Sequence, residues 1–159
     1  MSLQLPTQAA TIHLMAGLLC KPITAKPAAA PFLASPGPRV IGLYVDDKGA
    51  VGSLWMCDVA AGAYLGAALS LIGPAVAAEA HKTGRLNEGL LENLREVVNV
   101  AASLFNVTGG GHVRLRDVLV PPAPIPADVV ALANVKKNRT DLDITVPGYG
   151  AGKLSFILV

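Results

Sequence analysis

The sequence contains few charged and aromatic residues and only two cysteines. Of its 159 residues, 15% are charged and 4% are aromatic, and 13 basic side chains nearly balance 11 acidic ones. Nucleic-acid binding depends on a concentrated stripe of Lys and Arg, which a net charge of +2 does not supply, so we expect no nucleic-acid partner. Cys20 and Cys57 lack CxxC spacing, which argues against a zinc site or a disulfide framework. We interpret both as reduced thiols in the core.

A secretory leader and a membrane span are also poorly supported. The first twenty residues contain no Lys or Arg, so they lack the basic start of a signal peptide, and we expect a cytoplasmic protein. Residues 59–78 are uncharged and nominally long enough to span a bilayer, but they are rich in Ala and Gly and are interrupted at Gly73-Pro74. We favour buried helices and no membrane partner. A membrane-associated protein that uses residues 59–78 is kept as an alternative hypothesis.

Apolar residues make up 52% of the chain, which is ample for one hydrophobic core in a single domain over residues 1–159. Apolar periodicity predicts three helices and a short fourth, and β-branched or large apolar segments predict five strands, two pairs of which are joined by hairpin turns. The predicted helices cover residues 8–19, 59–72, 87–106 and 75–81, and the predicted strands cover 40–45, 51–57, 112–120, 142–146 and 154–159. This pattern indicates an α+β fold, with helices packed on a mainly antiparallel sheet.

The two halves of the chain repeat the same order of elements. In each half a helix leads into a proline-rich segment, at residues 26–31 and 121–124, and then into a hairpin. A chance likeness in a chain rich in Ala and Pro is the alternative. We favour a duplicated domain with pseudo-two-fold symmetry.

The predicted helix at 87–106 has a sharply divided surface. Its apolar residues form one stripe, whereas Glu92, Glu96, Asn99 and Ser103 follow one another at helical spacing on the opposite side. We call these four residues the polar ridge. A solvated helix face is the ordinary explanation for such residues. Asn99 is nevertheless a poor helix former in a helix interior, which suggests that it has a function.

A spacing motif lies on this ridge. Glu92, Glu96, Asn99 and Pro122 occur in the pattern Glu, three residues, Glu, two residues, Asn, twenty-two residues, Pro. This resembles the signature of the CheC/CheX/FliY chemotaxis phosphatases, in which the first position is usually Asp or Ser instead of Glu. The likeness extends from the first predicted helix to the last strand and is closest to CheX-like members with one site, because Ala10 and His13 stand where a second Glu and Asn would be.

The resemblance implies a function and roles for these residues. Family members hydrolyse the aspartyl phosphate of a response-regulator receiver domain, so Asn99 would orient the attacking water and Glu96 would pair with a receiver lysine. The partner-binding surface would include Glu92, Ser103 and Pro122. The resemblance implies no metal or cofactor in this chain, Mg²⁺ in the partner receiver site, and a homodimer. The alternative hypothesis is a catalytically silent binding module on the same scaffold.

Overall fold

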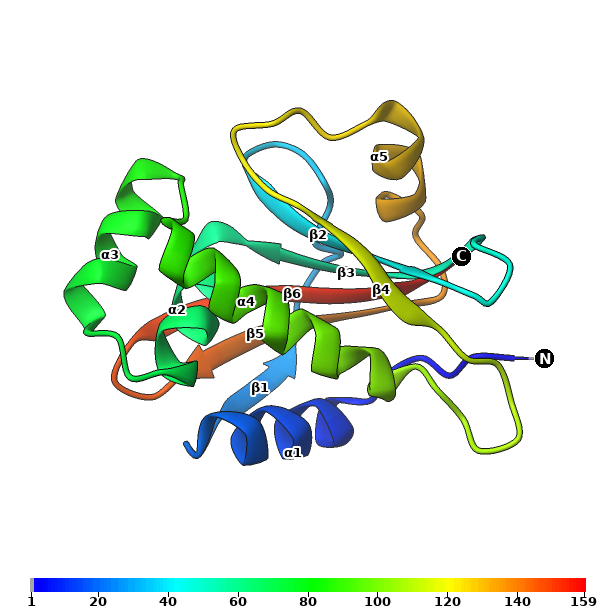
Figure 1. The fold of residues 1–159 in the computed structure, drawn as a ribbon, viewed down its shortest axis with the longest axis horizontal. Coiled ribbons are helices and arrows are strands. Elements are labelled where there is room, and N and C mark those ends of the chain that lie inside the picture. The colour runs from blue at the N-terminus through cyan, green and yellow to red at the C-terminus, as the bar shows by residue number, and fades with distance from the viewer. Residues whose placement is uncertain (1) are drawn as a thin grey trace.

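A computed structural model describes residues 2–159, in which a six-stranded antiparallel sheet has helices on both faces (Figure 1). The sheet order is β1-β5-β6-β3-β2-β4. The elements are α1 (Gln8–Leu19), β1 (Thr24–Pro27), β2 (Arg39–Val45), β3 (Val51–Asp58), α2 (Val59–Leu69), α3 (Pro74–Thr83), α4 (Glu88–Ala101), a 3₁₀ turn (Ala102–Leu104), β4 (Arg114–Leu119), α5 (Ala127–Ala133), β5 (Arg139–Val146) and β6 (Gly150–Leu158).

The strand order contains the two-fold repeat that the sequence predicted. Exchanging β1 with β4, β2 with β5 and β3 with β6 gives the same order read from the other edge. The central pair is β3 and β6, where Trp55 lies opposite Phe156 and the two rings meet edge to face at 5.6 Å between centroids. Both rings are fully buried. The symmetry therefore relates α1 to α4, the helices that open the two halves.

The two sheet faces have different covers. Helices α1, α2 and α4 pack on one face around a large core that contains Trp55 and Phe156, and α3 packs against α2. A smaller core on the other face joins α5 and the segment before β2 to the sheet. Helix α2 can lie close to β6 because Gly152 has no side chain, and a Cβ there would approach the Ala61 nitrogen to 2.6 Å. The abundance of Ala and Gly in α2 thus reflects tight packing on a sheet.

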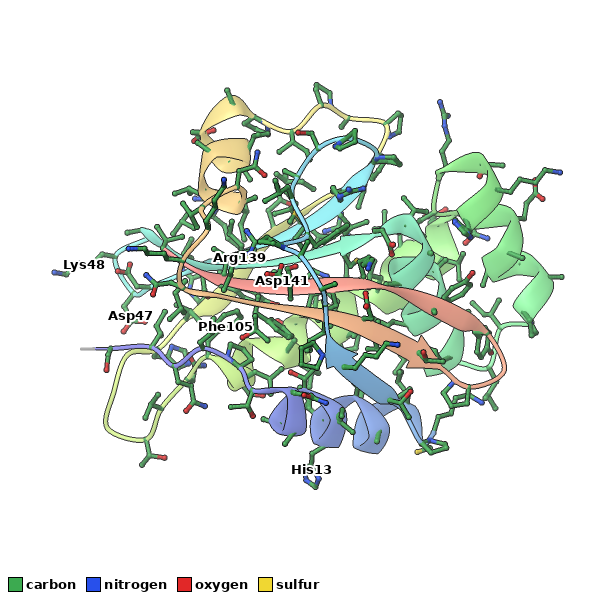
Figure 2. The ribbon with its side chains drawn as sticks, turned by 180° about the vertical axis from the view of Figure 1, so that it is seen from behind. His13, Asp47, Lys48, Phe105, Arg139 and Asp141 are labelled. Atoms are coloured by element: carbon green, nitrogen blue, oxygen red, sulfur yellow. The ribbon has the colours of Figure 1, made fainter. Side chains whose placement is uncertain are left out.

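The sheet face that α5 covers is held by a buried ion pair at the start of β5 (Figure 2). The Arg139 guanidinium lies 2.7 Å from Asp141 Oδ1, and the two side chains are 4% and 11% exposed. Arg139 also donates hydrogen bonds to the carbonyl oxygens of Ala133, Val135 and Phe32. These bonds satisfy a buried cation and tie α5 to the segment before β2.

Several predictions need correction. Strand β1 and helix α5 were missed, because β1 is a four-residue edge strand that ends in Pro27, and α5 is a seven-residue helix without a capping side chain. The α-helix predicted over 87–106 ends at Ala101, where the chain tightens into the 3₁₀ turn. Cys20 is exposed and not in the core, because it caps α1 in the left-handed conformation with φ 53°.

The remaining segment predictions are close to the structure. Residues 59–78 divide into α2 and α3, and among residues 2–159 no helix is both long and apolar enough to cross a bilayer. Cys57 is buried, and burial raises the pKa of its thiol to about 12. The β2–β3 turn is closed by the Asp46 carboxylate, which accepts hydrogen bonds from the N–H groups of Lys48 and Ala50, both at 2.9 Å.

Candidate functional site

The candidate site is the solvent-facing side of α4. The helix begins after Asn87, whose side chain accepts a hydrogen bond from the Leu90 N–H at 2.8 Å, and Glu88 adds a negative charge near the positive end of the helix dipole. Its inner side is fully apolar: Leu90, Leu94, Val97, Val98 and Ala101 are buried. This division of the helix surface leaves only one side free to meet a partner.

Helix α2 fixes the N-terminal half of α4. Gly66 lets the two backbones approach each other, since a Cβ there would lie 2.7 Å from the Leu90 carbonyl oxygen. The Asn93 side chain donates hydrogen bonds to the Gly66 carbonyl at 2.9 Å and to the Ser70 hydroxyl at 2.6 Å. These contacts hold α4 against α2 and use none of the side chains of the polar ridge.

Strand β2 fixes the C-terminal half of α4. The Tyr44 hydroxyl donates a 2.6 Å hydrogen bond to the Val98 carbonyl, which lies in the helix between Glu96 and Asn99. Burial raises the pKa of Tyr44 well above its ordinary value, so the hydroxyl stays protonated and remains a donor. Gly42 lies under the same residue, and a Cβ there would come within 2.6 Å of Val98 Cγ1. The two ridge residues of the motif therefore stand on a fixed stretch of helix.

All four residues of the polar ridge are exposed, which is the arrangement the sequence predicted. Within residues 2–159, the Glu96 and Asn99 side chains have no ion-pair or hydrogen-bond partner. Ser103 differs, because it lies in the 3₁₀ turn and its hydroxyl donates to the Val100 carbonyl at 2.9 Å. Glu96 and Asn99 thus present a free carboxylate and a free carboxamide three residues apart on one helix face.

The structure also places an ion pair beside the ridge that the sequence analysis did not identify. Arg95 Nη1 lies 4.0 Å from Asp117 Oδ1 on the edge strand β4, and both side chains are about half exposed. The register of β2 with β4 shifts between Leu43 and Tyr44 and leaves Arg116 as an extra residue, a β-bulge next to Asp117. The charge pattern of α4 gave no signal for this pair, because its acidic partner is on another element.

Pro122 does not lie with Glu96 and Asn99. It lines a hollow with the loop before β2 and the turn between α3 and α4, including Arg39, Gly84 and Arg85. That turn precedes the first residue of α4, whereas Asn99 lies near its last turn, eleven residues or about 17 Å further along the helix axis. A direct role next to Asn99 is therefore not supported by the position of Pro122.

The symmetry-related helix α1 carries no second copy of the site. It has no acidic or basic residue apart from His13, which is exposed and projects away from the fold (Figure 2). Ala10 is half-buried, and it occupies the position in α1 that corresponds to Glu96 in α4. Within residues 2–159 no group of three or more His, Cys, Asp or Glu side chains is arranged to hold a metal ion.

Comparison with known proteins places this fold. No family model and no curated protein matches the sequence. A chain of the CheX-CheY-BeF3-Mg²⁺ complex from Borrelia burgdorferi is 17% identical, with a TM-score of 0.54 over 92% of this chain and 90% of that one. FliY of Thermotoga maritima is 15% identical, with a TM-score of 0.52 over 96% and 83%. A chain of the FliM-SpeE complex from H. pylori is 7% identical, with a TM-score of 0.65 over 95% and 80%. The chain has the CheC/CheX/FliY-like fold, and at these identities the likeness establishes the fold alone.

Proposed function

We propose that this chain hydrolyses the aspartyl phosphate of a response-regulator receiver domain. The observation that carries the proposal is the exposed pair Glu96 and Asn99, held side by side on a fixed helix of a CheX-like fold. One similar structure is a complex of CheX with CheY, a receiver, in the presence of BeF3 and Mg²⁺. That complex supports a receiver as the partner.

The chemistry of the pair suits this reaction. An aspartyl phosphate has a good leaving group, and the receiver would supply Mg²⁺ to neutralise charge on the phosphoryl oxygens, so the partner lacks only a positioned water. The Asn99 carboxamide can accept a hydrogen bond from that water and donate one nearby without changing the charge of the site. The Glu96 carboxylate would pair with a receiver lysine and fix the register of the two proteins. This chain needs no metal of its own for these steps.

The other ridge residues have supporting roles in this proposal. Glu92 lies one turn before Glu96 and extends the acidic part of the contact surface. Ser103 offers an acceptor oxygen at the other end, because its donor is already used. Pro122 would contact the partner only at the far end of the interface, beside the hollow near the start of α4. We further propose that the protein is cytoplasmic and forms a homodimer. Size-exclusion chromatography with light scattering would check the homodimer.

The test is phosphate release from receiver domains of the same organism, each charged with acetyl phosphate. Wild-type protein should accelerate release from at least one receiver. Asn99→Ala should reduce that acceleration by about 10²-fold or more, the scale of losing a group that positions a reactant. Glu96→Ala should weaken receiver binding and raise the concentration needed for half-maximal rate. Unchanged rates in both variants would remove these residues from the mechanism.

The second candidate is a binding module without catalytic activity. Two observations favour it. The TM-score to a chain of the FliM-SpeE complex is 0.65, which exceeds the 0.54 found for a chain of the CheX complex. In addition, Glu92 stands where the family usually has Asp or Ser. This candidate predicts that a receiver binds through the polar ridge while its phosphate is lost no faster than in isolation. Titration calorimetry beside the phosphate-release assay separates the two functions.

A further inference from the structure

The charges on α4 present a problem for any phosphorylated partner. Three carboxylates on this helix are exposed, at Glu88, Glu92 and Glu96, and they would repel a phosphoryl group that carries close to two negative charges. Arg95 is the only Lys or Arg within α4. Within α4, Arg95 is therefore the residue that can add to the receiver's Mg²⁺ in offsetting this repulsion.

Arg95 lies next to the ridge in a position to act on the same ligand as Asn99. The two residues are four apart, so their side chains share one side of the helix. One helical turn rises about 5.4 Å, which the long arginine side chain can cover. A phosphoryl oxygen that is near the Asn99 amide would lie within reach of the guanidinium.

The present partner of Arg95 holds it weakly. The 4.0 Å separation from Asp117 and the half-exposed side chains, 47% and 53%, describe a surface ion pair of small net free energy. Asp117 itself is fixed, because its Oδ1 accepts a 2.8 Å hydrogen bond from the Val118 N–H. Arg95 is therefore set toward β4 when no partner is present and can leave at little cost. Arg114 and Arg116 are also exposed on this strand.

We propose that Arg95 recognises the phosphorylated state of the partner: its guanidinium leaves Asp117 on docking and donates paired hydrogen bonds to oxygen atoms of the aspartyl phosphate. Planar guanidinium groups match phosphate oxygens with two parallel N–H bonds, which gives both affinity and orientation. Asp117 then competes with the phosphoryl group for Arg95, so breaking this surface pair costs a small part of the affinity for the phosphorylated partner. This inference rests on the proposed receiver partner but not on catalysis, since recognition precedes and does not require hydrolysis.

The experiment measures dissociation constants for receiver domains of the same organism with and without beryllofluoride, which mimics the phosphoryl group on the receiver aspartate. Wild-type protein should bind one loaded receiver more tightly than its unloaded form. Arg95→Ala should reduce this ratio about tenfold, and Arg95→Lys should restore part of it, because Lys keeps the charge but lacks the paired donors. Asp117→Asn should change affinity in the opposite direction and tighten binding of the loaded form. Lys136→Ala is the matched control, since it removes one exposed positive charge near α5 on the other face of the sheet.

The outcomes separate this inference from the proposed function. Phosphate release that fails while Arg95→Ala still abolishes the preference for the loaded receiver removes the phosphatase and keeps the recognition. An intact preference in Arg95→Ala, an equal loss in Lys136→Ala, or a wild-type protein that binds both forms equally or binds no receiver would overturn the inference.

Discussion

The two halves of this molecule share one sheet topology and differ in what their helices present to solvent. Helix α4 divides into a buried apolar side and an exposed polar ridge, whereas its counterpart α1 is apolar on nearly all sides and has no Asp, Glu, Lys or Arg. The backbone arrangement is common to both halves, so it cannot by itself make a site. The comparison teaches that function here depends on a few side chains added to one of two equivalent helices.

The largest effect is expected from exchanging the residues at equivalent places on the two helices. Asn99→His should reduce phosphate-release acceleration by about 10²-fold, because the imidazole holds its two nitrogens on a rigid ring and cannot offer an amide's adjacent donor and acceptor. His13→Asn should give no gain, since Ala10 supplies no carboxylate beside it. A faster phosphate release with His13→Asn would mean that an asparagine on this scaffold is sufficient for activity without a neighbouring carboxylate.

A second contrast concerns the arginines that begin the symmetry-related strands β2 and β5. Arg139 is paired with buried Asp141, so Arg139→Ala should lower the free energy of unfolding by about 3–5 kcal/mol, because a carboxylate is left buried without its cation. Arg39 is half-buried, donates to three backbone carbonyls and stacks 4.2 Å from the Phe32 ring centre. Arg39→Ala should cost less, about 1–2 kcal/mol. Urea denaturation checks both, and equal losses would contradict the contrast.

The same ion pair predicts how stability changes with pH. Burial raises the pKa of Asp141, but hydrogen bonds from Arg139, Ser155 and the Phe32 N–H outweigh it and leave the pKa below its ordinary value. A lowered folded-state pKa stabilises the protein above the ordinary pKa of Asp, about 3.9, and this contribution is lost as the pH falls through the lowered value. Wild-type protein should therefore lose stability more steeply than Arg139→Ala as the pH falls below about 4. Parallel curves for the two proteins would contradict the assignment.

A third contrast compares one glycine that contacts α4 with one inside α1. Gly66→Ala should destabilise the protein by about 1–3 kcal/mol, because the new Cβ meets the Leu90 carbonyl and α4 must shift away from α2. Gly17→Ala should stabilise it by about 0.5–1 kcal/mol, since no atom lies within 4 Å of a Cβ there and Ala is the better helix former. Changes of opposite sign in the thermal unfolding temperature of the two variants would confirm that α4 is closely packed at Gly66 and that α1 is open at Gly17.

The smallest difference in stability between the two halves is expected where the two helices are alike. Both begin with a capping side chain: Thr7 accepts from the Ala10 N–H at 3.1 Å, and Asn87 accepts from the Leu90 N–H at 2.8 Å. Thr7→Ala and Asn87→Ala should each cost about 1 kcal/mol in chemical denaturation. Only Asn87→Ala should also reduce receiver binding, because it loosens the start of the helix that carries the ridge.

Much of this fold was predictable because local signals agreed with the final packing. Helix α1 was predicted at its observed bounds, and both hairpins formed between the predicted strand pairs, where Gly49 and Gly148 adopt the positive φ that the turns require. Strand β1 was not predictable, because its four residues become a strand only by pairing with β5. The end of α4 was placed too late, since the apolar stripe continues through Phe105 after the α-helical hydrogen bonds have ended.

The sequence by itself determined the division of α4 into two sides, because periodicity fixes which side chains share a helix face. It thereby placed Glu96 and Asn99 together. Only the tertiary structure decided that Tyr44 and Gly66 hold this helix in place, that Arg95 meets Asp117, and that Pro122 lies far from Asn99. These relations join residues distant in the chain, and their positions depend on how the elements pack, which no local pattern records.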